Sequence, residues 1–213
     1  NPSESGSAFV IKNTTDYQDN YADGSASVGM WAARTAGAWG NNLSVSQCAS
    51  ATAYEETAKT TATAASVGAT VVAVASGTGI GAGDIVNFGD EYEYRVVSVA
   101  TNDLSIVRKD EPSYYGTSDS SGLHSELTGT PDVRRRWRYY DIFDKAPGTS
   151  PYAQTRGGLN DELHIAIIDE DGDISGTKGS VLEKFAALSK ASDGKTPQGD
   201  TNYYSDVIYN QSN

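Results

Sequence analysis

The chain consists mainly of short segments in which apolar and polar residues alternate, separated by Gly, Asn or Asp. Alternation with a period of two is typical of half-buried β-strands, because successive side chains of a strand point to opposite faces. The pattern predicts strands at Ala8–Lys12, Leu43–Gln47, Thr70–Ala75, Asp84–Phe88, Glu91–Ala100, Leu104–Arg108, Val133–Phe143 and Glu162–Asp169. The strands between residues 70 and 108 follow at roughly ten-residue spacing, which predicts a small antiparallel β-barrel or sandwich. Gly89-Asp90 and Asn102-Asp103 are expected hairpin turns.

One segment carries the signals of a helix. Ser180 and Glu183 have the spacing of a capping box, with Ser180 at the N-cap. An apolar face at helical spacing follows, made of Leu182, Phe185, Ala186 and Leu188. We therefore predict a helix beginning at Ser180. The Ala- and Thr-rich segment Ala51–Ala65 has no apolar stripe, and it fits either a helix or a linker.

Composition and charge narrow the classes of function. The chain has 213 residues, with 16 Lys and Arg against 28 Asp and Glu, and a formal net charge of −12. Such an acidic chain is a poor general binder of nucleic acid or of an anionic membrane surface. Its single cysteine, Cys48, excludes an intramolecular disulfide and fits synthesis in a reducing cytosol. The chain begins Asn1-Pro2-Ser3 without Met, and we expect it to be a piece of a longer polypeptide.

The candidate sites for metal or cofactor chemistry are weak. Asp169-Glu-Asp-Gly-Asp173 begins like a calcium loop, but Ile174 and Ser180 stand where an EF-hand needs Gly and Glu, so a solvated turn is expected. Gly77–Gly83 lacks the glycine spacing of a dinucleotide loop and is expected to be a flexible connection. The two histidines and one cysteine do not have the spacing of a zinc site. We predict no metal site, no cofactor and no enzymatic activity.

A cluster of arginines stands out against the acidic background, at Arg134-Arg-Arg-Trp-Arg138. In a strand, Arg134, Arg136 and Arg138 would share one face, and Arg135 and Trp137 the other. A nucleic-acid patch is one interpretation of this row. Ion pairs with acidic surfaces of the same domain or of a neighbouring subunit are the expected one, and we name Arg134, Arg136 and Arg138 as candidate inter-subunit contacts.

Three segments, taken in order, resemble a known family. Ala33–Val45, which reads ARTAGAWGNNLSV, resembles the "(S/P)GxWGN-x-(I/L)-x-V" segment of contractile tail sheath proteins of tailed bacteriophages, with Ala36 at the first position of that pattern. Asp161–Gly172 followed by Gly176–Phe185 is similar to the next sheath segment, a strand and then a helix. Ser189–Gly194 and Asn202–Ile208 resemble its continuation. The resemblance lies almost wholly outside residues 48–132.

This resemblance implies a structural role rather than catalysis. Sheath subunits of large phages stack as six-fold rings around a tail tube, slide past one another on contraction, and serve genome injection. The implied partners are other sheath subunits, with the tail tube and baseplate contacted through parts of the chain not present here, and neither nucleic acid nor a membrane. The implied location is the virion tail, after synthesis in the host cytoplasm. The alternative is a carbohydrate-binding or adhesin-like β module, since Tyr, Trp, Asn and Thr also line sugar sites.

The resemblance also implies an α+β fold with two domains. Residues 1–48 and 133–213 would form a discontinuous sheath core, a mixed sheet with flanking helices. Residues 49–132 would form an inserted, outward-facing antiparallel β-barrel or sandwich. Because an inserted domain enters and leaves its host at neighbouring points, we expect the Leu43–Gln47 strand to pair with the strand Arg136–Phe143. We also expect two separate cores, one of Val71, Val74, Ile85, Val86, Phe88, Val96, Val99, Leu104 and Ile106, the other of Leu163, Ile165, Ile167, Leu182, Phe185 and Leu188.

Overall fold

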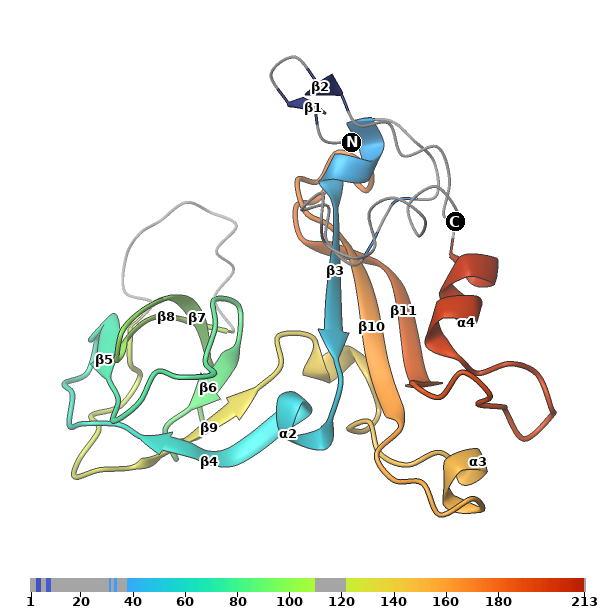
Figure 1. The fold of residues 1–213 in the computed structure, drawn as a ribbon. Helices are drawn as coiled ribbons and strands as arrows, with labels where there is room; N and C mark the ends of the chain where they lie inside the picture. The colour runs from blue at the N-terminus through green and yellow to red at the C-terminus, as the bar shows by residue number, and fades with distance from the viewer. Residues whose placement is uncertain are drawn as a thin grey trace. The chain divides into compact units, whose positions relative to one another are not determined.

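The computed structural model describes residues 3–4, 7–8, 31, 33, 38–109 and 122–212. The chain divides into two compact units (Figure 1). The first unit comprises residues 1–48 and 147–213, and the second unit comprises residues 49–146. The described part is α+β, with antiparallel sheets and few helices. The sheet that the sequence predicted as mixed is antiparallel, and its one parallel contact among the described residues is an isolated bridge from Ser189 to Tyr203.

The first unit is built on a three-stranded sheet with the order β11-β10-β3. The central strand, β10 (Glu162–Asp169), is buried along its whole length. It pairs on one side with β3 (Leu43–Cys48) and on the other with β11 (Ser180–Ser189). The remaining elements of the unit are β1 (Ser3–Glu4), β2 (Ser7–Ala8), the 3-10 helix η1 (Ala38–Asn42), α3 (Pro151–Gln154) and α4 (Tyr204–Gln211).

The core of the first unit lies on one face of this sheet. Alternate residues of β10 supply Leu163, Ile165 and Ile167, which cluster with Leu188 of β11 and Val207 of α4. Phe185 packs against this cluster. The sequence analysis placed these residues of β10 and β11 in one core. Leu182, assigned to the same core, is not part of the cluster.

The helix predicted from Ser180 is wrong, because this segment is strand β11. Leu188 and Phe185 are three residues apart, yet they pair with Leu163 and Ile165, which are two apart. The register shifts there and again between Ile167 and Ile168. Because a β-bulge adds a residue to one strand, apolar residues three or four apart can face the same side of a sheet. The bulges therefore gave a strand the spacing of a helix.

The second unit is a six-stranded antiparallel sheet with the order β4-β9-β6-β7-β8-β5. Its strands are β4 (Glu55–Thr61), β5 (Val71–Ala73), β6 (Ile85–Asn87), β7 (Tyr94–Ala100), β8 (Asp103–Arg108) and β9 (Asp132–Arg136). Just beyond β4, Ala62 bridges Val74, the Thr63 N–H donates to the Ala73 carbonyl at 2.9 Å, and the Ala75 N–H donates to the Thr61 carbonyl at 2.8 Å. Backbone hydrogen bonds thus run from β4 through the other five strands and back to the end of β4.

The second unit has its own core, separate from that of the first. Its buried cluster contains Ala62, Val72, Val74, Ile80, Val86, Phe88, Tyr94, Val96, Leu104, Ile106, Leu123, Leu127 and Val133. Most of the residues expected in this core are therefore found there. Two expected residues are exceptions: Val71 faces outward with 49% of its surface exposed, and Ile85 is buried but does not belong to this cluster.

Several local expectations for the second unit need correction. The Ala51–Ala65 segment is neither a long helix nor a linker: a single turn, α2 (Ala51–Tyr54), leads directly into β4. The strand expected to reach Phe143 ends at Arg136, and a short 3-10 helix, η3 (Tyr140–Ile142), follows. The β7–β8 turn is Thr101-Asn102, one residue earlier than expected, with Thr101 at a φ of 58°. In the first unit, the expected strand Ala8–Lys12 lies outside the described residues after Ala8.

The predicted pairing between Leu43–Gln47 and the Arg136–Phe143 segment is wrong. The first of these, in β3, pairs with β10. The arginine strand, β9, pairs with β4 and β6 in the other sheet. Residues 133–146 consequently group with the second unit rather than with residues 1–48, where the sequence analysis had placed them.

Candidate functional site

The arginine row lies on strand β9 of the second unit, and the structure brings together two of its three predicted members. Arg134 and Arg136 flank one carboxylate of β4, that of Glu55, with nitrogen–oxygen distances of 3.3 Å each. The register pairs Glu55 directly with Arg136, which puts their side chains on one face. Arg138 follows the end of the strand, is exposed, and lies over the ring of Tyr139, 5.3 Å from its centroid.

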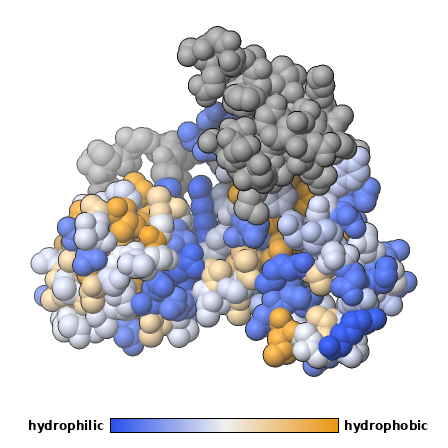
Figure 2. All heavy atoms as spheres, viewed as in Figure 1, coloured by the Kyte–Doolittle hydropathy of each residue, from blue (hydrophilic) through white to orange (hydrophobic). Residues whose placement is uncertain are grey.

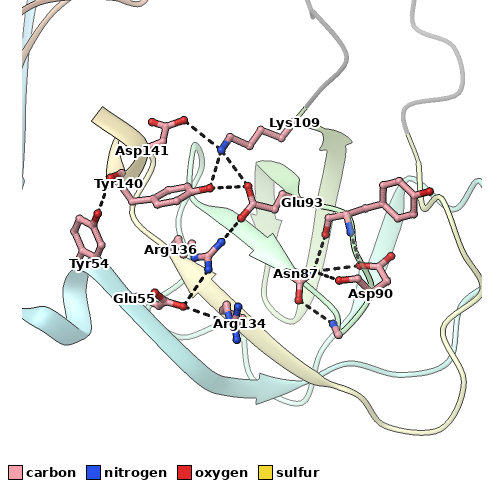
Figure 3. A network of polar contacts seen from close by, with 12 residues as sticks. Tyr54, Glu55, Asn87, Asp90, Glu93, Lys109, Arg134, Arg136, Tyr140 and Asp141 are labelled. Carbon is pink, nitrogen blue, oxygen red and sulfur yellow. Dashed lines mark hydrogen bonds and ion pairs between the residues drawn. The ribbon is translucent and has the colours of Figure 1, made fainter. Parts of the chain in front are cut away.

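Arg136 is also part of a larger polar network (Figure 3). Its guanidinium forms an ion pair with Oε1 of Glu93, and the other oxygen of that carboxylate lies 3.0 Å from Nζ of Lys109. The Tyr140 hydroxyl donates to the same Glu93 oxygen at 2.6 Å and accepts from Lys109 at 2.8 Å. Lys109 further pairs with Asp141 at 3.2 Å. The network thus joins strands β4, β8 and β9 and the segment before β7 to η3.

The surroundings of Glu93, Lys109 and Arg136 shift the pKa of each toward its charged form. Burial alone would raise the pKa of Glu93, but hydrogen bonds from Tyr140 and Lys109 and the charges of Lys109 and Arg136 together hold it below its ordinary value. For Lys109 burial acts to lower the pKa, but Tyr140 and the carboxylates outweigh it and the pKa is raised. The pKa of Arg136 is raised in the same way: burial acts to lower it, but the charges of Glu55 and Glu93 outweigh burial. None of these groups is set to exchange a proton near neutral pH.

The opposite face of β9 carries a second, more buried ion pair. Arg135 binds Asp84 through two parallel contacts, from Nε at 2.9 Å and from Nη2 at 3.0 Å. Its remaining Nη1 donates to the Ala53 carbonyl of α2. Trp137, on the same side, is buried and stacks on Phe143 with ring centroids 5.4 Å apart. The alternation expected for the row therefore holds from Arg134 to Trp137 but does not extend to Arg138, and its inward side stabilises the unit.

One tyrosine connects the two ends of the second unit. Tyr54, at the end of α2, is buried and its hydroxyl lies 2.6 Å from the Tyr140 carbonyl and 3.0 Å from the Phe143 carbonyl. The Trp137 N–H donates to the Tyr54 carbonyl at 2.8 Å. The segment that begins the unit is thus bonded directly to the segment that ends it.

Sequence analysis missed Glu55, Glu93, Lys109 and Tyr140, which complete the network around Arg136. Glu55, Glu93 and Lys109 come from segments far apart in the chain, and the strand register brings them together. The one sequence signal was the local excess of basic residues on β9 in an acidic chain, which requires carboxylate partners without naming them.

The acidic loop of the first unit is a turn. The Asp169 carboxylate accepts backbone N–H groups from Gly172 at 2.9 Å, Ile174 at 3.0 Å and Ser175 at 2.6 Å. Although burial alone would raise the pKa of Asp169, these bonds, with one from the Ser175 hydroxyl, lower it. Its oxygens therefore already have donors, as expected for a turn. Across the part of the chain that the structure describes, no group of three or more His, Cys, Asp or Glu side chains could hold a metal ion.

The remaining candidates also have structural roles. His164 is buried in β10, where its Nδ1 accepts the Ala187 N–H at 2.9 Å, and it pairs across strands with Cys48. His124 belongs to the second unit. Gly77 lies against the Thr101 carbonyl, where a Cβ atom would be 2.2 Å from the oxygen, and Gly79 and Gly83 have φ values of 76° and 93°. These glycines serve a tight loop, rather than the flexible connection expected from the sequence.

Polar and apolar residues are unevenly spread over the visible surface. On the face shown in Figure 2, hydrophilic residues predominate and hydrophobic ones form small separate spots. Among the helices described, none is long and apolar enough to cross a membrane.

Comparison with known proteins gives one distant relative. No protein-family model matches the chain, and no solved structure matches it. The chain is 25% identical over 236 residues to a tail sheath protein of Salmonella phage ViI, and the match covers 97% of this chain and 33% of that protein. The chain therefore spans about a third of the length of the curated relative that it matches. Along almost its whole length, it is similar to one part of a phage tail sheath protein.

Proposed function

We propose that the chain is part of a structural subunit of a contractile phage tail sheath. The observation that carries the proposal is the likeness to a tail sheath protein over 97% of the chain, rather than over one motif. In this role the subunit polymerises in six-fold rings around the tail tube, is connected to the baseplate, and contracts during genome injection. It is a component of the virion tail and performs no catalysis.

The two units suit a discontinuous core with an inserted β domain. The first unit is formed from both ends of the chain, and the second from one continuous segment between them. The circuit of hydrogen bonds through β4 to β9 supports a small closed barrel for the inserted part. We place the boundaries of that domain at residues 49 and 146, because β9 belongs to its sheet.

The arginine row remains the proposed inter-subunit contact, with different roles for its members. Arg138 is exposed, and the Arg134 side chain is 43% exposed, so both can contact an acidic surface of a neighbouring subunit. Arg136 is occupied by Glu55 and Glu93, and it fixes the carboxylate beside Arg134. Arginine suits such a contact because its planar guanidinium binds carboxylates in a fixed geometry.

The location is tested by immunogold electron microscopy of the virions that carry this protein. Antibodies raised against the 213-residue chain should label the tail along its length, and the label should follow the sheath when the tail contracts. Label confined to the head, to fibres, or to the baseplate would overturn the proposal.

The contact is tested in the complete sheath protein by Arg138→Glu. We expect sheath tubes to form poorly, as measured by sedimentation and negative-stain microscopy. Arg156→Glu is the matched control, because Arg156 is also an arginine lying over a tyrosine ring, that of Tyr152, but in the first unit. Equal assembly of the two variants would remove Arg138 from the contact.

A further inference from the structure

A tyrosine on the second unit is exposed yet held firmly in place. Tyr92 is 39% exposed, and its ring stacks on the His124 imidazole with centroids 3.8 Å apart and planes within 20° of parallel. Tyr92 lies just before β7, and His124 lies on the segment that leads to β9. Two segments about thirty residues apart in the chain thus build one aromatic platform, as stacked rings require close control of both backbones.

The Asp90 carboxylate supplies that control. One of its oxygens accepts the Tyr92 N–H at 3.3 Å, and the other accepts the Tyr94 hydroxyl and the Ser125 hydroxyl at 2.9 Å each. The hydroxyl oxygen of Tyr94 in turn accepts the backbone N–H of His124 at 3.0 Å. A single carboxylate therefore fixes the segments that carry both rings.

Asn87 completes the support from β6. Its side-chain amide donates to the Asp90 and Tyr92 carbonyls at 2.7 Å each, and its oxygen accepts the Gly89 N–H at 3.0 Å (Figure 3). Burial and the neighbouring Asp90 raise the pKa of Tyr94 to about 12, so its hydroxyl keeps its proton across the physiological range. A platform fixed in advance loses little conformational entropy when a ligand binds to it.

The platform borders a depression in the surface. The depression has a volume of about 420 Å³ and is lined by Glu91, Tyr92, Glu93 and Lys109. This volume lies within the range of small-molecule sites, which combine an apolar wall with a few polar groups that set orientation.

The lining selects the chemistry of the ligand. Carboxylates and an ammonium group stand together, so an anion would be repelled by Glu91 and Glu93, and a cation by Lys109 and by Arg136 behind Glu93. A neutral ligand with hydroxyl groups can donate to Glu91 and to the remaining lone pair of Glu93, whereas the three N–H donors of Lys109 are already used by Glu93, Tyr140 and Asp141. A ligand that also has an apolar face can stack on the Tyr92 ring. A nucleic acid offers hydroxyl groups and bases that can stack on a ring, but it is not neutral. Its phosphates are disfavoured by a chain with net charge −12.

We propose that this depression binds a neutral saccharide, with one sugar ring stacked on Tyr92 and its hydroxyl groups bonded to Glu91 and Glu93, while Lys109 and Arg136 balance the charge of the carboxylates. The site is independent of the sheath role, and it would bring the second unit into contact with glycans at the host surface or in the medium.

The test is a titration of the ¹⁵N-labelled chain with glucose, galactose, mannose, N-acetylglucosamine, lactose and maltose, followed by amide chemical shifts. We expect at least one sugar to shift the amides of residues 91–93, 109 and 124, with a dissociation constant in the millimolar range. Tyr92→Ala should weaken binding about tenfold, since the stacked face is lost. Tyr92→Phe keeps the ring and should bind within about twofold of the parent chain.

The controls make each outcome decisive. Tyr209→Ala removes another exposed tyrosine, in α4 of the first unit, and should leave binding unchanged. Equal loss in Tyr92→Ala and Tyr209→Ala, or no shift around residue 92 with any sugar, overturns the proposal. Shifts at this site with a lysine-rich peptide or with heparin, but not with neutral sugars, would also overturn it and assign a charged ligand. If Tyr92→Ala unfolds the chain, Glu91→Gln replaces it, and unchanged sugar affinity in that variant contradicts the role given to Glu91.

Discussion

The two units differ in how they stabilise two carboxylates each. In the first unit, Asp161 and Asp169 accept hydrogen bonds only from backbone N–H groups and serine hydroxyls, as far as the described residues show. In the second unit, Asp84 and Glu93 are bound by Arg135, Arg136 and Lys109. Neutral donors hold a carboxylate by local geometry, whereas cations hold it partly by fields that salt can screen. In the first unit, neutral donors hold the turn after Asp169 and join the start of α3 to β11 through Asp161, and in the second unit, cations connect distant segments.

The largest effect is expected from breaking the buried pair of the second unit. Arg135→Ala leaves the Asp84 carboxylate without its cation at a site where Asp84 is only 8% exposed. We expect a loss of about 3 kcal/mol in the free energy of unfolding, measured by urea denaturation. The Asp84→Ala, Arg135→Ala double variant should lose less than the sum of the single variants. Strict additivity would show that the two groups do not interact.

A somewhat smaller effect is expected from Asp161→Ala in the first unit. The carboxylate accepts the Ser150 N–H at 2.7 Å and the hydroxyls of Ser150 and Ser189 at 2.8 and 2.7 Å, and both serines are buried. Its removal leaves those donors unsatisfied, at a cost of about 2 kcal/mol. Hydrogen exchange should quicken for the amides of β10 and β11. Asp193→Ala, at an exposed side chain, is the control and should change stability by less than about 0.5 kcal/mol.

The salt dependence should separate the two units directly. Glu93→Gln should cost about 1 kcal/mol at low ionic strength, because the network around it is partly exposed. That cost should shrink as sodium chloride is added, since added ions screen the pairs. The cost of Asp161→Ala should not change with salt. The same salt response in both variants would contradict the comparison.

The smallest contrast is expected with pH. Burial opposes ionisation of Asp161 and Glu93, but hydrogen bonds lower the pKa of both, and Lys109 and Arg136 contribute to the lowering at Glu93. A carboxyl whose pKa is lower in the folded state stabilises the protein above its unfolded pKa of about 4, and this stability is lost as pH falls through the folded value. Urea denaturation between pH 7 and pH 3 should therefore show falling stability in the parent chain. The decline should be shallower in Asp161→Ala and in Glu93→Gln, and an unchanged slope would contradict the assignment.

The sequence predicted the strands whose alternation is regular. Glu162–Asp169 has the predicted bounds, because β10 carries apolar residues at alternate positions with no interruption. The strand Ser180–Ser189 was not predictable from alternation, because its bulges break the period of two and Ala187 has a φ of 52°. Residues 55–61 lack an alternation of apolar and polar residues, so no strand is predicted there, although their threonines favour a strand over a helix.

Only the arginines of the candidate site were predictable from the sequence. The alternation of the arginines follows from the period of a strand, so the separation of Arg134 and Arg136 from Arg135 could be derived. Their partners could not, because Glu55 and Glu93 reach them through a strand order, β4-β9-β6-β7, that no local pattern specifies. The Tyr92–His124 platform depends likewise on tertiary contacts through Asp90.

The Tyr54 hydroxyl has a mechanical consequence. It holds the carbonyls of Tyr140 and Phe143, so the first residues of the second unit are fastened to its last ones. A force applied between residues 49 and 146 acts first on the Tyr54 hydrogen bonds and only then on the strands. Tension transmitted through the rest of the chain therefore does not load the β-sheet of the second unit until the hydrogen bonds of Tyr54 break.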